Sequence, residues 1–277
     1  MKNIQYSVCL VAFLGTCAFS CQKKFDPNSY KPSETFSGYS SSSQVAAASL
    51  VAYFGFEGSL IDSVSGTQGT AAGTSFGTGI IGQGLSVGVG NYVTFAMTTA
   101  LKGVQSGTVS YWVNTAENTA GIQEPICFVN GTQFWSNFET FFDGQTATSA
   151  VFKIHAFGNG GSSEEWLTAW TINNPWSVWD HIVVTYDEPS TTFTAYVNGA
   201  QLGTATAAGF GALNMANTDT LVFGTTQFQT NPSLTSGATS QSWASNVLGA
   251  IDEVRIYNTA LSATDVAALY KLELLGR

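Results

Sequence analysis

Short runs of apolar residues alternate with polar residues over most of residues 49–277. The alternation repeats every two residues, which is the period of a strand with one buried face. Glycine, asparagine, serine and threonine separate the runs and favour tight turns between them. We expect strands at 50–56, 92–97, 108–113, 126–129, 150–157, 166–172, 181–186, 193–197 and 220–224. This spacing predicts two packed antiparallel sheets.

Two local signals predict where elements begin and turn. Asn198-Gly199 separates two strand-like runs, and this dipeptide supplies the positive φ angles of a type I′ hairpin turn. Residues 251–257 alternate as a further strand, and Ser262 then opens a capping-box sequence that contains Asp265. We therefore expect a tight hairpin at Gly199, a closing strand, and one short amphipathic helix at the C-terminus.

Composition narrows the class of protein. The chain has 277 residues, a formal net charge of −9 and 29 glycines, and aromatic residues make up 13% of it. This length suits one sandwich domain with a sizeable core, and the residue usage suits many short strands. Nucleic acid is a poor partner for so acidic a chain, because few positive charges are available to neutralise phosphates.

The first twenty residues have the pattern of a signal peptide. Lys2 precedes a mostly apolar run that ends in Ala18-Phe19-Ser20-Cys21, which resembles the cleavage site of a bacterial lipoprotein. We expect cleavage after residue 20 and lipidation of Cys21, with Cys17 as a competing site. The protein would then be held at the outer membrane or cell surface by its lipid alone.

A tether is expected between the lipid and the folded domain. Residues 21–48 contain Pro27, Pro32 and a run of four serines, without a sustained apolar period. We expect this segment to be a flexible linker and the domain to span 49–277.

Two kinds of ligand site are excluded by residue types and context. Cys127 is the only cysteine of 49–277, so neither an internal disulfide nor a cysteine-cluster zinc site can form there. Residues 77–82 match the glycine spacing of a dinucleotide fingerprint, but no helix follows them to receive a pyrophosphate. We therefore expect a glycine turn at this position and no bound nucleotide.

An ordered set of segments resembles one known family. The segments are LVAYFGFEGSLIDSVSG at 50–66, GIIGQGLS at 79–86, TVSYWV at 108–113, WDHIVVTYD at 179–187 and YVNG at 196–199. Together they resemble the laminin-G-like, concanavalin-A-like jelly-roll family over nearly all of 49–277, with 121–175 fitting least well. The resemblance implies an all-β, two-sheet antiparallel jelly-roll sandwich with a short C-terminal helix.

The resemblance also implies a structural calcium ion where the first strand meets the last. Calcium prefers carboxylate and carbonyl oxygens. Glu57 follows the first strand, Asp252 lies on the last, and Asp62 is a third candidate ligand. The alternative for Asp252 is a carboxylate that orders a turn by accepting backbone N–H bonds.

Catalysis is not the expected activity. Glycoside hydrolases need two carboxyl groups astride the scissile bond. The related glucanases carry a Glu-x-Asp-x-x-Glu strand, and the nearest segment here has Ala250 and Arg255 at two of the acidic positions. His155 and His181 lie in strand runs, where we expect packed, hydrogen-bonded side chains.

Tryptophans supply the candidate ligand-binding residues. Residues 133–141 read as a strand that presents Trp135, Asn137 and Glu139 outward, opposite Phe134 and Phe138. Alternatively, the loops of 114–125 and 158–165 cover this face and bury Trp135. Trp176 and Trp243 lie at loop positions and are two further candidates. The tryptophans on expected strands are expected to pack in the core, and they include Trp112, Trp166, Trp170 and Trp179.

The function predicted from the sequence is binding. We expect a lipid-anchored, extracytoplasmic module, and the family resemblance implies that its partner is a glycan. At the candidate residues, an indole ring could pack against a sugar ring while amides and carboxylates orient its hydroxyls. An adhesion or structural protein that binds another protein is the alternative, and a glycoside hydrolase is a further one.

Overall fold

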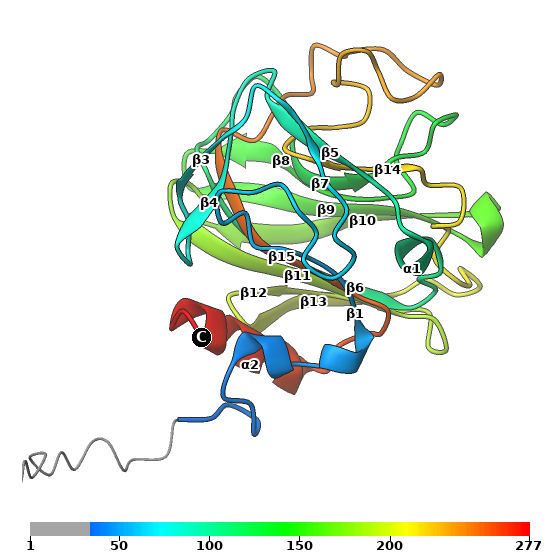
Figure 1. The fold of residues 1–277 in the computed structure, drawn as a ribbon. Coiled ribbons are helices and arrows are strands. Elements are labelled where there is room, and N and C mark those ends of the chain that lie inside the picture. Colours follow the sequence, from blue (N-terminus) through cyan, green and yellow to red (C-terminus); the bar gives the residue numbers. More distant parts are fainter. Residues whose placement is uncertain (1–33) are drawn as a thin grey trace, which may run out of the picture. The chain divides into compact units, whose positions relative to one another are not determined.

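Two antiparallel sheets pack face to face and enclose the main hydrophobic core (Figure 1). The computed structural model describes residues 34–277, and residues 35–277 form one compact unit. The predicted signal peptide, Cys21 and the first part of the predicted tether lie outside the described residues. No helix of the described part is long and apolar enough to cross a membrane.

The strands are divided as eight and seven. The larger sheet contains, in spatial order, β13 (Ala200–Thr206), β12 (Thr192–Val197), β11 (Trp179–Asp187), β6 (Gly107–Thr115), β15 (Gly249–Tyr257), β4 (Gln83–Val87) and β3 (Ser75–Thr78), and β1 (Leu50–Phe54) also pairs with β15. The smaller contains β10 (Ser163–Asn173), β9 (Ser149–Gly158), β8 (Phe138–Thr146), β7 (Gln123–Phe128), β14 (Thr220–Phe223), β5 (Tyr92–Ala96) and β2 (Thr70–Ala72).

Helical segments are few and short. The described α-helices are α1 (Thr99–Lys102) and α2 (Ala263–Leu274), and the 3-10 turns are η2 (Ser42–Gln44), η3 (Ala47–Ser49) and η4 (Asn159–Gly161). The Ser262 hydroxyl accepts a hydrogen bond from the backbone N–H of Asp265 at 3.1 Å, so the predicted cap opens α2. The two-sheet sandwich with a short C-terminal helix confirms the predicted fold.

The predicted hairpin and closing strand are both present. Asn198 and Gly199 have φ angles of 51° and 76° and join β12 to β13, as a type I′ turn requires. Strand β15 contains a bulge, where Glu253 has a φ of 49°. Because of this extra residue, both Ile251 and Val254 point into the core despite their three-residue spacing.

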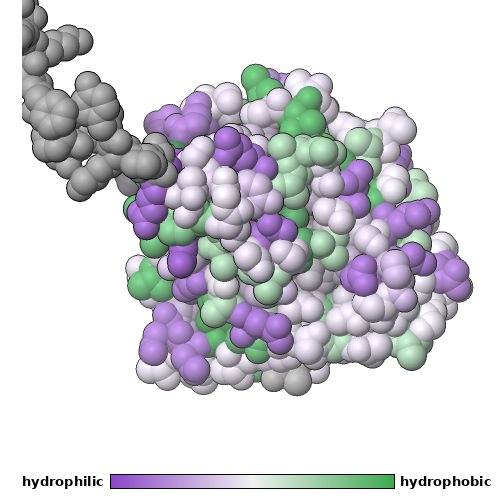
Figure 2. Space-filling model, turned by 90° about the horizontal axis from the view of Figure 1, so that it is seen from below, coloured by the Kyte–Doolittle hydropathy of each residue, from purple (hydrophilic) through white to green (hydrophobic). Residues whose placement is uncertain are grey.

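Helix α2 covers the outer face of the eight-stranded sheet. Its apolar side packs on this face in a second cluster that includes Val183, Tyr257, Val266, Leu269 and Leu272. In Figure 1 the helix lies below the sheets, while the long segment between β14 and β15 lies above them. Figure 2 shows the α2 side of the molecule, where hydrophobic and hydrophilic residues are interspersed.

A buried ion pair anchors α2 to the sheet. Arg255 of β15 donates from Nε to Glu273 Oε1 at 2.6 Å and from Nη2 to Glu253 Oε2 at 2.6 Å. Trp112 Nε1 donates to the other Glu273 oxygen at 2.8 Å. Burial raises the pKa of Glu273 to about 7, and the charge of Arg255 acts in the opposite direction.

The folded unit begins earlier than the sequence indicated. Residues 35–48 were expected to belong to a flexible linker, yet Val45 is buried against the α2 cluster. Arg255 Nη2 also donates to the Ser42 hydroxyl at 3.1 Å. The compact unit therefore starts at Thr35 and not near Ser49, because a buried arginine and an apolar helix face bind this polar segment.

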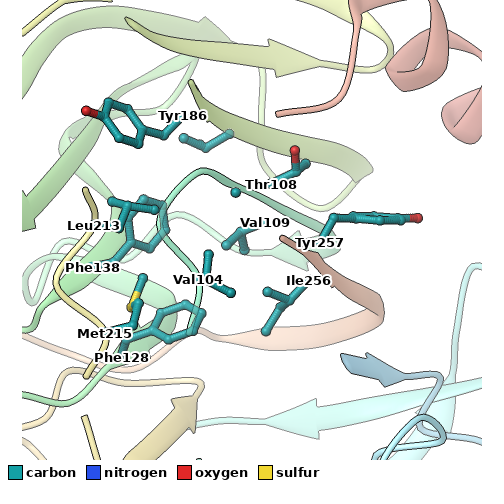
Figure 3. A pocket seen from close by; sticks show the side chains of 12 residues that line it. Val104, Thr108, Val109, Phe128, Phe138, Tyr186, Leu213, Met215, Ile256 and Tyr257 are labelled. Carbon is teal, nitrogen blue, oxygen red and sulfur yellow. The ribbon is translucent and has the colours of Figure 1, made fainter. Parts of the chain in front are cut away.

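An enclosed apolar space lies at one end of the core and is shown in Figure 3. It is lined by side chains of both sheets and of the connecting segments, among them Val104, Phe128, Tyr186, Leu213 and Ile256. A water-sized sphere can enter only about 10 Å³ of it, which is barely the room for one water. The space is a packing void and not a ligand pocket.

We expect Glu273→Ala to destabilise the protein by about 3–5 kcal/mol, because it leaves the Arg255 charge buried without its main partner. Chemical denaturation measures this change. The control is Asp219→Ala in the exposed Lys102–Asp219 pair, where the carboxyl is 85% exposed and about 1 kcal/mol or less is expected. Equal losses for the two variants would contradict the anchoring role of Glu273.

Candidate functional site

A cysteine, a glutamate, a histidine and a tryptophan form a row across the outer face of the seven-stranded sheet. Cys127 of β7 pairs with Glu139 of β8, Glu139 with His155 of β9, and His155 with Trp166 of β10. Directly paired residues of adjacent strands point to the same face. The four side chains therefore lie next to one another on β7, β8, β9 and β10. The first three members of the row are fully buried.

An aromatic cluster lies over the His155 end of this row. Trp135 lies at its centre, with ring centroids 5.0 Å from Trp166, 5.8 Å from Phe141 and 5.8 Å from Trp243. Further contacts complete the cluster, which we define as Phe134, Trp135, Phe141, Trp166, Phe228 and Trp243. Trp243 is the most exposed of its tryptophans at 42%, and Trp135 and Trp166 are half-buried. The cluster thus offers an apolar aromatic surface to solvent.

A carboxyl pair lies beneath the cluster. Glu124 and Glu139 are fully buried and their carboxyl groups are in contact. Within the described part of the chain, no N–H or O–H donor reaches either oxygen of Glu124. Burial raises the pKa of Glu124 well above its ordinary value, and the charge of Glu139 adds to the rise. Glu124 is therefore the protonated member of the pair, as two adjacent carboxylates cannot both ionise at low cost.

The carboxyl pair connects to the surface through His155. Its Nδ1 lies 2.8 Å from Glu139 Oε1, and its Nε2 lies 3.1 Å from Glu164 Oε1. Glu164 also accepts a hydrogen bond from Trp166 Nε1 at 3.1 Å and is 47% exposed. A polar path thus leads from buried Glu124 to the exposed edge of the aromatic cluster.

Cys127 is not a reactive thiol in this setting. Burial raises the pKa of its thiol well above the ordinary value, and the nearby charge of Glu139 acts in the same direction. The thiol therefore stays protonated, and a protonated thiol is a weak nucleophile.

The structure differs from the strand predicted at 133–141. Strand β8 begins at Phe138, and residues 130–137 form a loop. Asn137 and Glu139 were expected to point outward, but both are fully buried. The half-buried state of Trp135 matches neither a free surface indole nor a core residue.

Asn137 is held inside by a saturated hydrogen-bond network. Its Nδ2 donates to Asn217 Oδ1 at 2.6 Å and to Thr218 Oγ1 at 2.7 Å, while its Oδ1 accepts from Asn130 at 2.9 Å and from Asn214 at 3.2 Å. These four bonds use the full capacity of an amide side chain. No capacity is left for a ligand, so Asn137 orders the loop that carries Trp135.

The two loop tryptophans occupy different places. Trp243 belongs to the aromatic cluster, as described above. Trp176 packs against Phe142 at a centroid distance of 6.1 Å and donates from Nε1 to the carbonyl of Thr146 at 2.6 Å. Trp176 therefore lies outside the cluster and serves the packing of the β8–β9 hairpin.

The sequence analysis missed Trp166 and Glu124. A bulge between Leu167 and Trp170 shifts the register of β10, so Trp166 points outward while Trp170 packs toward the core. The core position expected of Trp166 is therefore wrong, and that of Trp170 agrees with the structure. Glu124 directly precedes the apolar run 125–129, and an acid at the edge of such a run can signal a buried functional or structural carboxyl.

The three candidate calcium ligands already have hydrogen-bond donors. Asp252 Oδ2 accepts from the backbone N–H of Ile80 at 2.8 Å and of Ile81 at 3.2 Å, and Glu57 Oε2 accepts from Gln83 at 3.1 Å. Both carboxyls thus order the turn between β3 and β4. Burial raises the pKa of Asp252 to about 8.

Asp62 is committed in a similar way. Its Oδ1 accepts from the backbone N–H groups of Tyr53 at 2.9 Å and Val64 at 3.0 Å, and its Oδ2 accepts from the Ser65 hydroxyl. N–H dipoles that point at a carboxylate occupy the positions a cation would take. No group of three or more potential metal ligands converges within residues 34–277. All three acids thus accept backbone N–H groups, as the turn-ordering alternative expected of Asp252, and calcium binding by them stays a prediction.

We expect Glu124→Gln to stabilise the protein increasingly as the pH rises. The folded-state pKa of Glu124 lies above that of the unfolded chain, so the wild type loses stability as the pH rises from about 4.3 through the raised value. Glutamine mimics the protonated acid and does not titrate. Urea unfolding at pH 4.5 and pH 8 measures the effect, with Asp219→Asn as the exposed control. A difference between variant and wild type that is the same at both pH values would contradict the protonated state of Glu124.

Known structures share this fold. Domain 4 of AbnA, an extracellular GH43 arabinanase of Geobacillus stearothermophilus solved with arabinotriose, is 19% identical with a TM-score of 0.56, covering 80% of this chain and 98% of that one. The ligand-binding domain of botulinum neurotoxin serotype D with N-acetylneuraminic acid is 12% identical, with a TM-score of 0.58. The binding domain of botulinum neurotoxin DC with rat synaptotagmin II is 13% identical, with a TM-score of 0.57.

Coverage differs among these similarities. This chain spans 52% of each of the two neurotoxin chains, which in turn cover 82% of it. At such identities the likeness concerns the fold.

No curated protein is significantly similar to this sequence. The sequence profile of the Laminin_G_3 family, described as concanavalin A-like lectin/glucanases superfamily, matches residues 87–267, which is more than half of the chain. The chain therefore belongs to the concanavalin A-like lectin/glucanase superfamily.

Proposed function

We propose that the aromatic cluster on the outer face of the seven-stranded sheet binds a glycan. The observation that carries the proposal is the exposure of Trp243 at 42% within a cluster of further indoles. A flat indole can pack against the C–H face of a sugar ring, and neighbouring polar groups can orient its hydroxyls. Glu164, which is exposed and bonded to Trp166, is such a group.

Two structural neighbours lend the proposal support by analogy. The arabinanase domain was solved with arabinotriose and the serotype D toxin domain with N-acetylneuraminic acid. Fold alone does not specify function, so the argument rests on the aromatic cluster. A protein ligand is the competing function, since a further neighbour was solved with synaptotagmin II.

We propose binding without hydrolysis. A glycoside hydrolase holds two carboxyl groups about 5–10 Å apart and open to the sugar. Glu124 and Glu139 are instead in contact and fully buried beneath the aromatic cluster. Their burial suits a structural role better than the roles of acid and nucleophile.

We further propose that the module is displayed outside the cytoplasm on a lipid anchor at Cys21. The apolar run before Ala18-Phe19-Ser20-Cys21 supports this proposal. Cys21→Ala is expected to release the protein from the membrane fraction or to block its maturation, as measured by fractionation and acyl labelling. A variant that remains acylated and membrane-bound would point to Cys17, and Cys17→Ala is the matched control.

We expect Trp243→Ala to weaken glycan binding at least about tenfold, a loss of roughly 1.4 kcal/mol, because it removes the exposed ring of the cluster. The melting temperature should fall by no more than about 4 °C, as for a loss near 1 kcal/mol in a domain of this size. A glycan array followed by calorimetry on the best binder measures the first effect. Val89→Ala, at a side chain 78% exposed away from the cluster, is the control. Unchanged affinity in Trp243→Ala would refute the proposed site.

A further inference from the structure

Trp166 belongs to two surfaces at once. One is the aromatic cluster, where its ring lies 5.0 Å from that of Trp135. The other is a groove of about 280 Å³ between β10 and β13, lined by Trp166, Leu167, Thr168, Trp170, Thr204 and Ala205. The cluster and the groove are therefore continuous across Trp166, from the exposed Trp243 to the sandwich edge.

The groove is shaped by specific backbone features. The bulge between Leu167 and Trp170 turns the Trp170 indole toward β13, the edge strand of the other sheet. A Cβ atom on Gly203 would lie only 2.1 Å from Trp170 Nε1, so glycine is needed for the indole to approach this strand. The half-buried indoles of Trp166 and Trp170 give the groove two aromatic contacts, and the hydroxyl groups of Thr168 and Thr204 give it two polar ones.

The combined surface lacks positive charge available to a ligand. Lys153, the basic residue beside the Phe141 ring, is paired with Asp143 at 2.5 Å. Glu164 is exposed at the cluster edge. A carboxylated or sulfated sugar would therefore meet a negative side chain without a free cation among the described residues of this surface, and such a juxtaposition disfavours binding.

We propose that the ligand is an uncharged polysaccharide bound along its chain, from Trp243 across Trp135 and Trp166 into the groove beside Trp170. This inference rests on the proposed glycan-binding function and specifies its ligand class. A single sugar can cover only part of such a surface. Affinity therefore grows with the number of sugar residues until both the cluster and the groove are filled.

The first test separates this inference from the function on which it rests. The full folded chain is titrated with linear neutral polysaccharides (arabinan, xylan, galactan, glucan and mannan) and with charged ones (polygalacturonate, chondroitin sulfate and polysialic acid). We expect at least one neutral polymer to bind and the charged ones to bind at least about tenfold more weakly. Tighter binding of a charged polymer would overturn the inference but leave the glycan-binding function intact. A complete lack of binding would overturn both.

The second test concerns the groove. Oligosaccharides of the best neutral binder, from two to six residues, are titrated against the wild type and Thr168→Gln, whose longer side chain fills the groove. We expect wild-type affinity to rise at least about tenfold over the series, and the variant to lose most of this gain while keeping its disaccharide affinity. Thr206→Gln, at an exposed position of β13 outside the groove lining, should behave as the wild type. Equal affinity for all lengths, or an unaltered series in Thr168→Gln, would overturn the inference.

Discussion

The buried ion pair between Arg255 and Glu273 fixes which outer face of the sandwich helix α2 covers. It holds α2 against the outer face of the eight-stranded sheet, and the bond from Arg255 to Ser42 adds the segment before β1 to the same face. Removing two charges from water is costly, and the attraction between them offsets this cost only when their remaining hydrogen bonds are satisfied. Trp112 and Glu253 supply those bonds. The outer face of the seven-stranded sheet is left for a ligand.

The outer face of the seven-stranded sheet is covered by aromatic side chains and loops and not by a helix. Beneath them the protein tolerates two glutamates in contact, and this is possible because Glu124 keeps its proton. Glu139 accepts a hydrogen bond from the backbone N–H of Ser136 at 3.3 Å, and Ser136 directly follows Trp135. The state of the carboxyl pair is thus linked to the loop that carries the central indole of the cluster. The exposed part of the proposed site and its buried support therefore form one structural unit.

The sequence predicted the parts of the fold that depend on local chemistry. Period-two alternation located most strands, Asn198-Gly199 located a hairpin, and Ser262 located the start of α2, because each of these signals acts within a few residues. No local signal predicted the bulge of β10 or the loop of 130–137. Each depends on contacts between distant segments, such as those of Asn137 with Asn214 and Thr218.

The candidate site was predictable only in part for the same reason. Trp243 could be chosen because it lies in a loop-like sequence, and it does belong to the cluster. Glu139 was expected at the surface and does lie on the outer face, but it is fully buried beside the loop that replaces the first five residues of the predicted strand. The pairing of Glu124 with Glu139 requires the register between β7 and β8, including its bulge after Gln123, which no local pattern specifies.

The central claim is that the ligand lies on the aromatic face of the seven-stranded sheet. Its most direct test follows the indole N–H resonances of the tryptophans by nuclear magnetic resonance during titration with the bound glycan. The account predicts that the resonances of Trp243, Trp135 and Trp166 shift with ligand concentration. That of Trp112, which is buried beneath α2 and bonded to Glu273, should stay in place. Shifts confined to Trp112, with the three cluster indoles unchanged, would contradict it.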